Sequence, residues 1–316
     1  MSRLDDLRLI ARIAQRYYVG GERQSRIAKD LRLSQATVSR MLKRASDEGI
    51  VRISLSAPKG TYPELENSLR DKYNIIDAVV VDCAENRDAA IMSRIGEAAA
   101  YFLESTIQSD EVIGISSWSE TILRMIDNVH PMAPGTASAV IQTLGGQGNP
   151  NVQKHATHVT TRLSILTGGE PVILQAPAVA TSKEAKKILS KDQFVREATD
   201  QFSRITLAFL GIGAVKPSGI LAQSGNTFSN EELKELAKRG AVAEISQRFL
   251  DAQGKAVDTA LNDRVIGISL AELAKVDRVV ALAGGKSKTE AIRATIKSNF
   301  VDVLITDRFT AARLIK

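Results

Sequence analysis

The stretch Gln24–Lys43, QSRIAKDLRLSQATVSRMLK, decides the fold of the first part of the chain. Its apolar residues form two helical faces separated by a turn, and they are Ile27, Ala28, Leu31, Leu33, Val38, Met41 and Leu42. Ser34 precedes the second face and is a good cap for a helix, since its hydroxyl can accept from a free amide of the first turn. The spacing predicts a helix-turn-helix, although Arg32 lies near the position of the turn that often carries glycine.

The polar side of the second predicted helix carries side chains that can reach base edges and phosphates from inside a major groove. The candidate DNA-contacting residues are Gln24, Ser34, Gln35, Thr37, Ser39, Arg40, Lys43 and Arg52. The alternative is an ordinary helical hairpin with a solvated basic face, and the charge distribution argues against it. Residues 1–60 contain 13 Lys or Arg and 6 Asp or Glu, whereas residues 61–316 contain 29 and 30. The net charge of +6 therefore arises at the N-terminal end, as expected for a module that binds double-stranded DNA.

The residues around this motif complete a small domain. Apolar positions at helical spacing predict a helix over residues 5–18 that packs behind the pair and ends at Gly20-Gly21. Residues 50–55 alternate like a strand of the size of a small wing, with Arg52 placed to meet a phosphate, or like a strand that only covers the helices. We therefore expect a (winged) helix-turn-helix domain over residues 1–56, a linker over 57–63, and a second domain over 64–316.

Composition indicates a globular protein of the cytoplasm. No run approaches the ~20 apolar residues that span a bilayer, and the first residues lack the apolar core of a secretory signal. Cys83 is the single cysteine, which excludes an intrachain disulfide and suits a reducing compartment. We interpret it as a small buried hydrophobe rather than a reactive thiol.

From Glu64 onward, short apolar runs alternate with amphipathic segments. The expected strands are residues 78–81, 112–115, 139–144, 172–174, 205–210, 265–268, 278–282 and 301–306. The expected helices are residues 89–104, 121–129, 152–166, 231–238, 288–297 and 308–314. Continuous apolar strands separated by helices predict a Rossmann-like α/β domain, with a mostly parallel sheet covered on both faces.

Loops after several expected strands favour a small-molecule pocket. In such folds the crevice lies beyond the carboxyl ends of the strands, where the strand order reverses. The loop from Ser116 to Thr121 offers hydroxyls and a helix N-terminus, glycines follow three other strands, and Lys286 or Lys288 could neutralise a phosphate. The chain has neither a GxGxxG nor a GxxxxGK[ST] fingerprint, so no nucleotide cofactor is expected.

Two further features have an ordinary and a functional interpretation. His155 and His158 share a helix face, but no cysteine or carboxylate completes a ligand set nearby, so no metal site is expected. Trp118, the single tryptophan, could stack on a sugar ring or simply pack in a core.

The whole chain resembles the SorC-type sugar-responsive transcription regulators of bacteria. The resemblance is carried, in order, by RIAKDLRLSQATVSRMLKRASDEGIV, GISSWSET, LGG, QAPAV, FLGIG, RFLDAQG and AGGKSKTEAIRATIKSNFVDVLITD. It implies a body related to sugar-phosphate isomerases and deaminases, a tetramer on paired operator sites, and a sugar, sugar alcohol or sugar-phosphate effector that changes DNA affinity.

The resemblance also implies which residues contact the effector. Carried over to this sequence, they are Ser116, Ser117, Ser119, Glu120, Thr121, Gly145, Gly146, His155, Glu244 and Lys288. Two departures from the family shift the expectation toward a less charged effector. Glu120 stands where some relatives have paired threonines and would repel a phosphate, and Leu144 stands where some relatives have a Lys or Arg that bonds the effector.

We therefore expect a DNA-binding regulator of carbohydrate metabolism genes, without catalysis. The rival hypothesis is a sugar-phosphate isomerase or deaminase with an appended DNA module, which needs a general base such as Glu120, Glu244 or Asp251. The spacing of these residues identifies no paired acid and base. A structural DNA-bending protein would not explain a body of 250 residues with a crevice.

Overall fold

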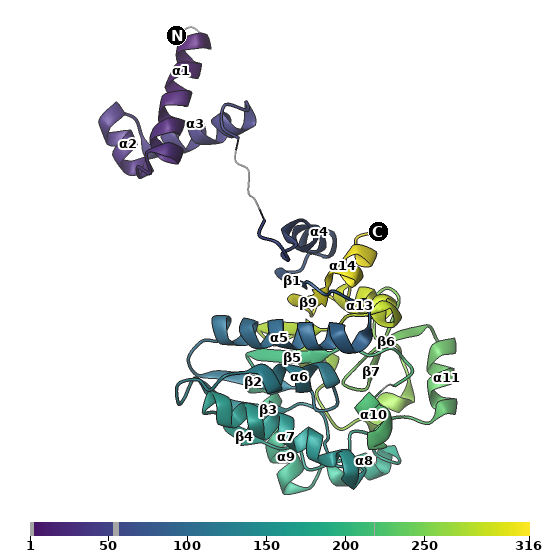
Figure 1. The fold of residues 1–316 in the computed structure, drawn as a ribbon. Coiled ribbons are helices and arrows are strands. Elements are labelled where there is room, and N and C mark those ends of the chain that lie inside the picture. The colour runs from purple at the N-terminus through teal and green to yellow at the C-terminus, as the bar shows by residue number, and fades with distance from the viewer. Residues whose placement is uncertain (1–2, 53–56, 218) are drawn as a thin grey trace. The chain divides into compact units, whose positions relative to one another are not determined.

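A computed structural model describes residues 3–52, 57–217 and 219–316 of the chain. The chain divides into two compact units, Met1–Pro58 and Lys59–Lys316, and each is described by itself (Figure 1). No helix within the described ranges is both long and apolar enough to cross a bilayer.

The first unit is a helical bundle built around the predicted helix-turn-helix. Its elements are α1 (Arg3–Ala14), the π-helical turn η1 (Gln15–Val19), α2 (Gln24–Leu31) and α3 (Gln35–Asp47). Its core consists of the buried residues Ile10, Ile13, Ala14, Ile27, Ala28, Val38, Leu42 and Ala45. The apolar spacing therefore identified the faces that pack together. The helix expected over residues 5–18 is α1 together with its π-helical continuation η1, which ends at Val19.

The connection between α2 and α3 has the geometry that the sequence indicated. Arg32 adopts a left-handed conformation with φ of 51°, a position at which a side chain costs about 1 kcal/mol. Ser34 caps α3, because its hydroxyl accepts from the amide of Thr37 at 3.0 Å. Residues 53–56 of the expected wing lie outside the described residues. Residues 50–52 have no regular structure.

The second unit is built on a seven-stranded sheet whose described neighbours are all parallel. Its strands are β1 (Asp77–Val81), β2 (Glu111–Ile115), β3 (Ala137–Gln142), β4 (Glu170–Val172), β5 (Leu207–Gly211), β8 (Arg278–Leu282) and β9 (Val303–Asp307). Their order in space is β1-β9-β8-β5-β2-β3-β4. A separate antiparallel hairpin contains β6 (Ala241–Ile245) and β7 (Arg248–Asp251).

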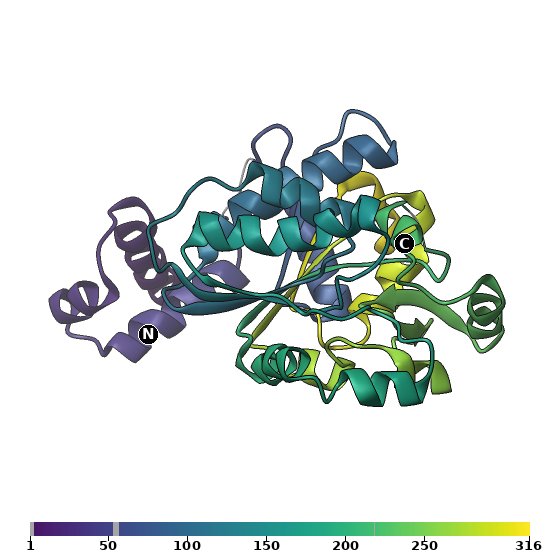
Figure 2. The same ribbon diagram turned by 90° about the horizontal axis from the view of Figure 1, so that it is seen from below.

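Helices cover both faces of the sheet (Figure 2). They are α4 (Pro63–Tyr73), α5 (Asp88–Thr106), α6 (Glu120–Asn128), α7 (Pro150–Thr167), α8 (Lys183–Leu189), α9 (Gln193–Asp200), α10 (Gly219–Ser224), α11 (Asn230–Lys238), α12 (Leu270–Leu273), α13 (Thr289–Ile296) and α14 (Arg308–Leu314). Short 3-10 turns are η2 (Gln201–Arg204), η3 (Ala260–Arg264) and η4 (Lys286–Lys288).

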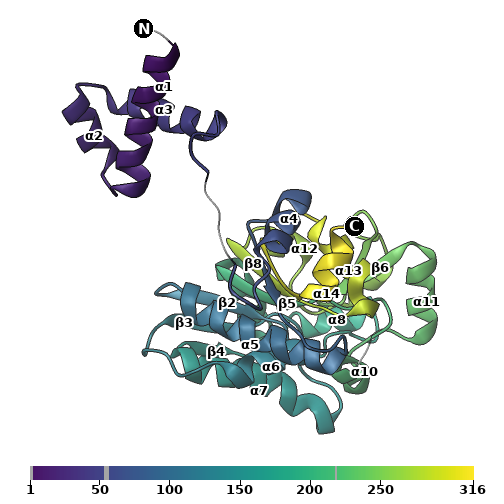
Figure 3. The ribbon, with the colours of Figure 1, turned by 45° about the horizontal axis from the view of Figure 1, so that its top comes forward.

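Side chains that alternate along each strand point to opposite faces of the sheet and form one core on each face. In β5, Leu207 and Phe209 pack with α5, α6 and α7, whereas Ala208 and Leu210 pack with the helices of the opposite face. The strands read as continuous apolar runs because both faces are buried. Near the chain's end, α4 lies beside α14, where the Tyr73 hydroxyl donates to the carbonyl of Leu314 at 2.7 Å (Figure 3).

The main secondary-structure errors lie in the part of the body outside the sheet. The strand expected at residues 265–268 is wrong, because Val265 and Gly267 form only isolated bridges, with Val179 and Leu144. The β6–β7 hairpin was not expected, since its turn lacks the Asn-Gly or Asp-Gly signal of a two-residue hairpin. Helices α4, α8, α9, α10 and α12 were also missed, and all but α4 are eight residues or shorter.

Candidate functional site

A cavity of about 240 Å³ lies where the strand order of the sheet reverses. From β2 the chain proceeds through β3 to β4 at one edge, whereas from β5 it proceeds through β8 to β9 toward the other edge. The loops after the adjacent strands β2 and β5 therefore diverge, which leaves a crevice at their carboxyl ends.

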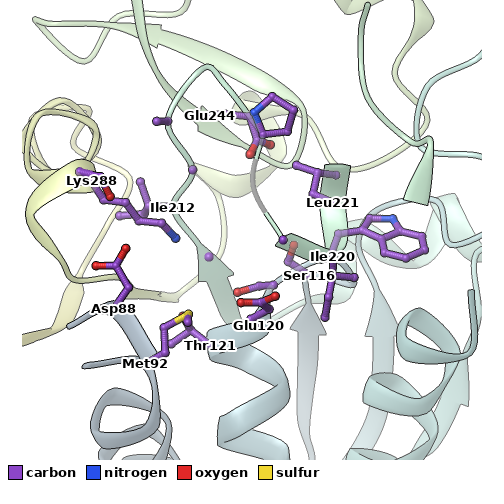
Figure 4. A pocket seen from close by; sticks show the side chains of 18 of the residues that line it. Asp88, Met92, Ser116, Glu120, Thr121, Ile212, Ile220, Leu221, Glu244 and Lys288 are labelled. Carbon is purple, nitrogen blue, oxygen red and sulfur yellow. The ribbon is translucent and has the colours of Figure 1, made fainter. Parts of the chain in front are cut away.

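The cavity is lined by residues that are far apart in the sequence (Figure 4). They are Asp88, Met92, Ser116, Trp118, Ser119, Glu120, Thr121, Leu144, Gly211, Ile212, Gly213, Ala214, Lys216, Pro217, Gly219, Ile220, Leu221, Glu244, Ser246, Gly284, Ser287 and Lys288. The polar ones come mainly from the β2–α6 loop, the start of α5, the β6–β7 hairpin and η4.

The β2–α6 loop contributes a helix N-terminus with hydroxyls. Ser119 caps α6, and its hydroxyl accepts from the amide of Ile122 at 3.4 Å. Ser116 and Thr121 are buried beside it, and Glu120 occupies the first turn of the helix. A carboxylate in the first turn of a helix is favoured by the helix dipole, and the negative charge of Glu120 would repel an anionic ligand bound beside it.

Glu244 is a buried carboxyl on the β6–β7 hairpin. Its side chain accepts from the amide of Gln247 at 2.5 Å, and its backbone is bridged to Gly213 in the loop after β5. Burial raises the pKa of Glu244 to about 7, while the Gln247 amide and the positive charge of Lys288 oppose that rise. Glu244 can therefore either accept or donate a hydrogen bond near neutral pH.

Lys288 lines the same cavity from η4, and Figure 4 shows its side chain extending between Asp88 and Ile212. Burial lowers the pKa of Lys288, while the negative charges of Glu244, Asp88 and Glu120 act in the opposite direction. The cavity therefore contains three carboxyl groups against the two amines of Lys288 and Lys216.

Six of the ten candidate effector residues line this cavity: Ser116, Ser119, Glu120, Thr121, Glu244 and Lys288. The other four, Ser117, Gly145, Gly146 and His155, are absent from its lining.

Packing explains the position of three of these four. The Ser117 hydroxyl donates to the carbonyl of Leu144 at 3.2 Å. A Cβ on Gly145 would lie 2.4 Å from the backbone of Pro177, and one on Gly146 would lie 2.2 Å from the Gln142 amide. These glycines therefore permit close packing behind the cavity wall.

Trp118 has features of both interpretations that the sequence left open, a residue of the ligand pocket and a residue of a core. It lines the cavity, yet it is only 6% exposed and packs in a core with Leu144 and Leu221. Its indole Nε1 donates to the carbonyl of Gly145 at 2.9 Å. The indole is therefore a fixed wall of the cavity rather than a mobile stacking platform.

The sequence did not identify several polar lining residues, among them Asp88, Lys216, Ser246 and Ser287. Asp88 begins the helix that follows β1, so its place at the carboxyl edge of a parallel sheet was a usable signal. Ser246 gave no signal, since the hairpin that carries it was not recognised. Among the described residues, no group of three or more His, Cys, Asp or Glu side chains is arranged to hold a metal ion.

In the first unit, the candidate DNA-contacting residues of α3 lie on its surface. Ser34, Gln35, Ser39, Arg40 and Lys43 are exposed, as is Arg52 beyond the helix, whereas Gln24 and Thr37 are partly buried. The hydroxyl of Thr37 accepts from Ser34 or donates to it at 2.8 Å, and the Arg40 guanidinium lies 3.4 Å from the same hydroxyl.

Two other arginines of this unit are engaged in ion pairs within it. Arg16 pairs with Glu22 and Asp30, and its guanidinium lowers the pKa of both carboxyls by hydrogen bonding. Arg44 pairs with Asp6 and Glu48, both at 2.8 Å. These contacts connect the three helices, so Arg16 and Arg44 serve the fold of the unit.

Comparison with known proteins gives a consistent result over the whole chain. A family model described as "Putative sugar-binding domain" matches residues 60–316. The chain is 32% identical to the erythritol catabolism regulatory protein EryD of Brucella abortus, over 97% of this chain and 96% of that protein. It is 29% identical to the deoxyribonucleoside regulator of Bacillus subtilis, over 96% and 95% of the two chains.

A solved structure shares the complete architecture. The full-length sorbitol operon regulator SorC from Klebsiella pneumoniae aligns with a TM-score of 0.74 at 25% identity, covering 99% of this chain and all of that one. The similarity therefore extends over the helical unit as well as the α/β unit.

Proposed function

This chain belongs to the SorC family of sugar-binding transcriptional regulators, and on that basis we propose that the cavity between the β2 and β5 loops is its effector site. The protein is a sugar-responsive transcription regulator and not a sugar-phosphate isomerase or deaminase. Ser116, Ser119, Glu120, Thr121, Glu244 and Lys288 are the residues assigned to effector binding. Ser117, Gly145 and Gly146, which lie outside the lining, are assigned to the support of that site, and His155 stays a candidate contact.

The effector in this proposal is an unphosphorylated sugar or sugar alcohol. The observation that carries this choice is Glu120, which lies in the first turn of α6 and lines the cavity, where its negative charge would repel a phosphate. Asp88 and Glu244 contribute two further carboxyl groups, so three carboxyl groups of the lining stand against the two amines of Lys288 and Lys216. Hydroxyl groups can both donate to carboxylates and accept from amines, so a neutral polyol matches the lining.

A ligand panel tests the effector class. We expect D-sorbitol, erythritol or 2-deoxy-D-ribose to raise the melting temperature of the full chain, since a ligand at 100 times its Kd stabilises by about 2.7 kcal/mol. The corresponding phosphate esters are the matched comparison and should give smaller shifts. Tighter binding of a phosphate ester, measured by calorimetric titration, would contradict the proposal of a neutral effector.

For DNA binding, we assign the reading of the major groove to the exposed face of α3, with Gln24, Ser34, Gln35, Thr37, Ser39, Arg40, Lys43 and Arg52 as contacts. The helix bears exposed polar and basic side chains on the side opposite its buried face. Phosphate contacts fix the position of the helix on the duplex, whereas contacts to base edges give sequence preference.

Replacement of Arg40 by Ala is expected to weaken operator binding by about 2 kcal/mol if its guanidinium contacts a base. The operator is first obtained by selection from a random duplex library with the wild-type protein, and affinities are then measured by fluorescence anisotropy. Arg44→Ala removes the same kind of side chain from α3, but Arg44 is held by Asp6 and Glu48. The Arg44→Ala substitution should therefore lower the free energy of unfolding of this unit. Equal operator affinity in Arg40→Ala and wild type would remove Arg40 from the contacts.

We further propose that the protein acts as a homo-oligomer in the cytoplasm, as a tetramer on paired operator sites. The effector would bind one arrangement of the subunits better and so shift the population between two spacings of the DNA-binding units. Light scattering of the eluting protein would give its mass, and a monomer at micromolar concentration with operator DNA present would contradict the proposal.

A further inference from the structure

The β6–β7 hairpin forms one wall of the cavity and contributes both Glu244 and Ser246 to the lining. The hairpin is fixed to the loop after β5, because the amide of Gly213 donates to the carbonyl of Glu244 at 2.9 Å. The reverse bond, from the Glu244 amide to the Gly213 carbonyl, is 2.8 Å long. A Cβ on Gly213 would lie 2.6 Å from Glu244 Oε2, so the absence of a side chain permits this approach.

The turn of this hairpin has an unfavourable backbone conformation for its residues. Ser246 has a φ of 48° and Gln247 a φ of 61°, both in the left-handed region. Two-residue hairpin turns of this kind usually carry Asn-Gly, Asp-Gly or Gly-Gly, which adopt it at lower cost. Residues in such a conformation cluster at binding sites, where the surrounding structure maintains them.

Buried polar atoms without a hydrogen-bond partner are concentrated in the same turn. Within the part of the chain that the structure describes, they include Ser246 Oγ, Gln247 Oε1 and Arg248 Nε, in three consecutive residues. Buried polar atoms in proteins are normally satisfied, so an unsatisfied group calls for an explanation. Ser246 is 4% exposed and is the member of this trio that lines the cavity.

The neighbouring residues have structural roles. The other guanidinium nitrogens of Arg248 donate to the carbonyls of Asn262 at 3.0 Å and of Gly267 at 3.5 Å. The backbone amide of Gln247 holds the Glu244 carboxyl. Ser246 directly precedes Gln247 in the turn, but its side-chain hydroxyl has no hydrogen-bond partner among the described residues.

We propose that Ser246 is a specificity-determining residue, whose hydroxyl pairs with one hydroxyl of a polyhydroxy effector next to the group that Glu244 binds. This rests on the proposed function of the cavity. An ionised carboxylate only accepts and an ammonium only donates, whereas the serine hydroxyl can do both, as a sugar hydroxyl requires. A site built to bond a hydroxyl rejects the analogue that lacks it, because its own polar group is then left unpaired.

The test is calorimetric titration of the full chain and its Ser246→Ala variant with D-sorbitol, erythritol, D-ribose, their phosphate esters and their monodeoxy derivatives. Ser246→Ala should weaken binding of the preferred compound about tenfold. For the monodeoxy derivative that lacks the hydroxyl bonded by Ser246, the affinity of the variant should differ from that of the wild type by less than about twofold. The variant should therefore no longer distinguish the parent compound from this derivative. Ser287→Ala makes the same change at an exposed serine of the lining and should leave the discrimination in place.

The other possible outcomes contradict the role of Ser246, the neutral effector or the effector site itself. An equal loss for the parent compound and all its deoxy derivatives would make Ser246 a structural residue of the turn, as would unchanged binding of every compound. Preference of the wild type for a phosphate ester would overturn the neutral effector and leave the Ser246 result interpretable on that ester. Binding of no compound by the wild type would overturn both the effector site and the assignment of Ser246.

Discussion

An Asp307→Ala variant is expected to lose about 4 kcal/mol in free energy of unfolding, the largest effect that we predict. Asp307 ends β9, is fully buried, and accepts from the amides of Phe309 and Thr310 at 2.9 Å, which caps α14. It also accepts from the amide of Gly285 at 3.1 Å and from the Thr310 hydroxyl at 2.5 Å. Alanine would leave several buried donors without an acceptor, and the loop that leads to Lys288 would lose an anchor.

Denaturant unfolding of the full chain measures this loss, with Asp192→Ala as a matched control. Asp192 also caps a helix through two amides, those of Phe194 and Val195, but it is exposed to solvent. Water can replace its carboxylate, so its loss should cost only about 1 kcal/mol. Similar costs for the two variants would show that the burial and the Gly285 contact of Asp307 add nothing to its role as a cap.

The second large effect is a pH-dependent destabilisation caused by Glu244. Its pKa in the folded protein is about 7, against 4.5 for an unperturbed glutamate, because burial disfavours its charged form. Between these two pH values the folded state binds more protons than the unfolded state, so the contribution of Glu244 to stability falls as the pH rises. Above about pH 7 the full cost, on the order of 3 kcal/mol, is present.

A Glu244→Gln variant removes this titration while keeping the size of the side chain. Its stability relative to wild type should be lowest near pH 5 and should increase by about 3 kcal/mol by pH 8. Urea unfolding of both proteins at pH 5, 6, 7 and 8 measures the difference, in which titrating groups that do not interact with Glu244 cancel. Glu231→Gln, at an exposed position of α11, should give a profile parallel to wild type. A parallel profile for Glu244→Gln would contradict the raised pKa.

Much of the fold followed from periodicity and charge. Six of the seven strands of the sheet overlap most of the apolar runs that the sequence indicated, whereas β4 shares only Val172 with the strand expected over residues 172–174. The α2–α3 pair was likewise apparent from its apolar spacing and the cap at Ser34. Local patterns of this kind are sufficient because each strand or helix must bury one or both faces regardless of its exact neighbours.

The errors fall where local patterns are weak. The β6–β7 hairpin has a Ser-Gln turn in place of a glycine-containing one, and tertiary packing maintains its conformation. Residues 265–268 are as apolar as a strand, but they form only isolated bridges, with Val265 buried in a small core and Ile266 and Ile268 in the large core beside the sheet. A short apolar run indicates burial more reliably than it indicates the kind of element.

The sequence by itself determined the division of the chain into a basic helical module and a nearly neutral α/β body, since charge and periodicity are properties of neighbours along the chain. Only the tertiary structure decided which polar residues share the cavity, bringing Asp88, Ser246 and Lys288 to one site and leaving Gly145 and His155 outside its lining. It also decided the raised pKa of Glu244 and the lowered pKa of Lys288. Desolvation and Coulomb interactions depend on distances in space, and Lys288 approaches Glu120 and Asp88, which are 168 and 200 positions away in sequence, only when the sheet has formed.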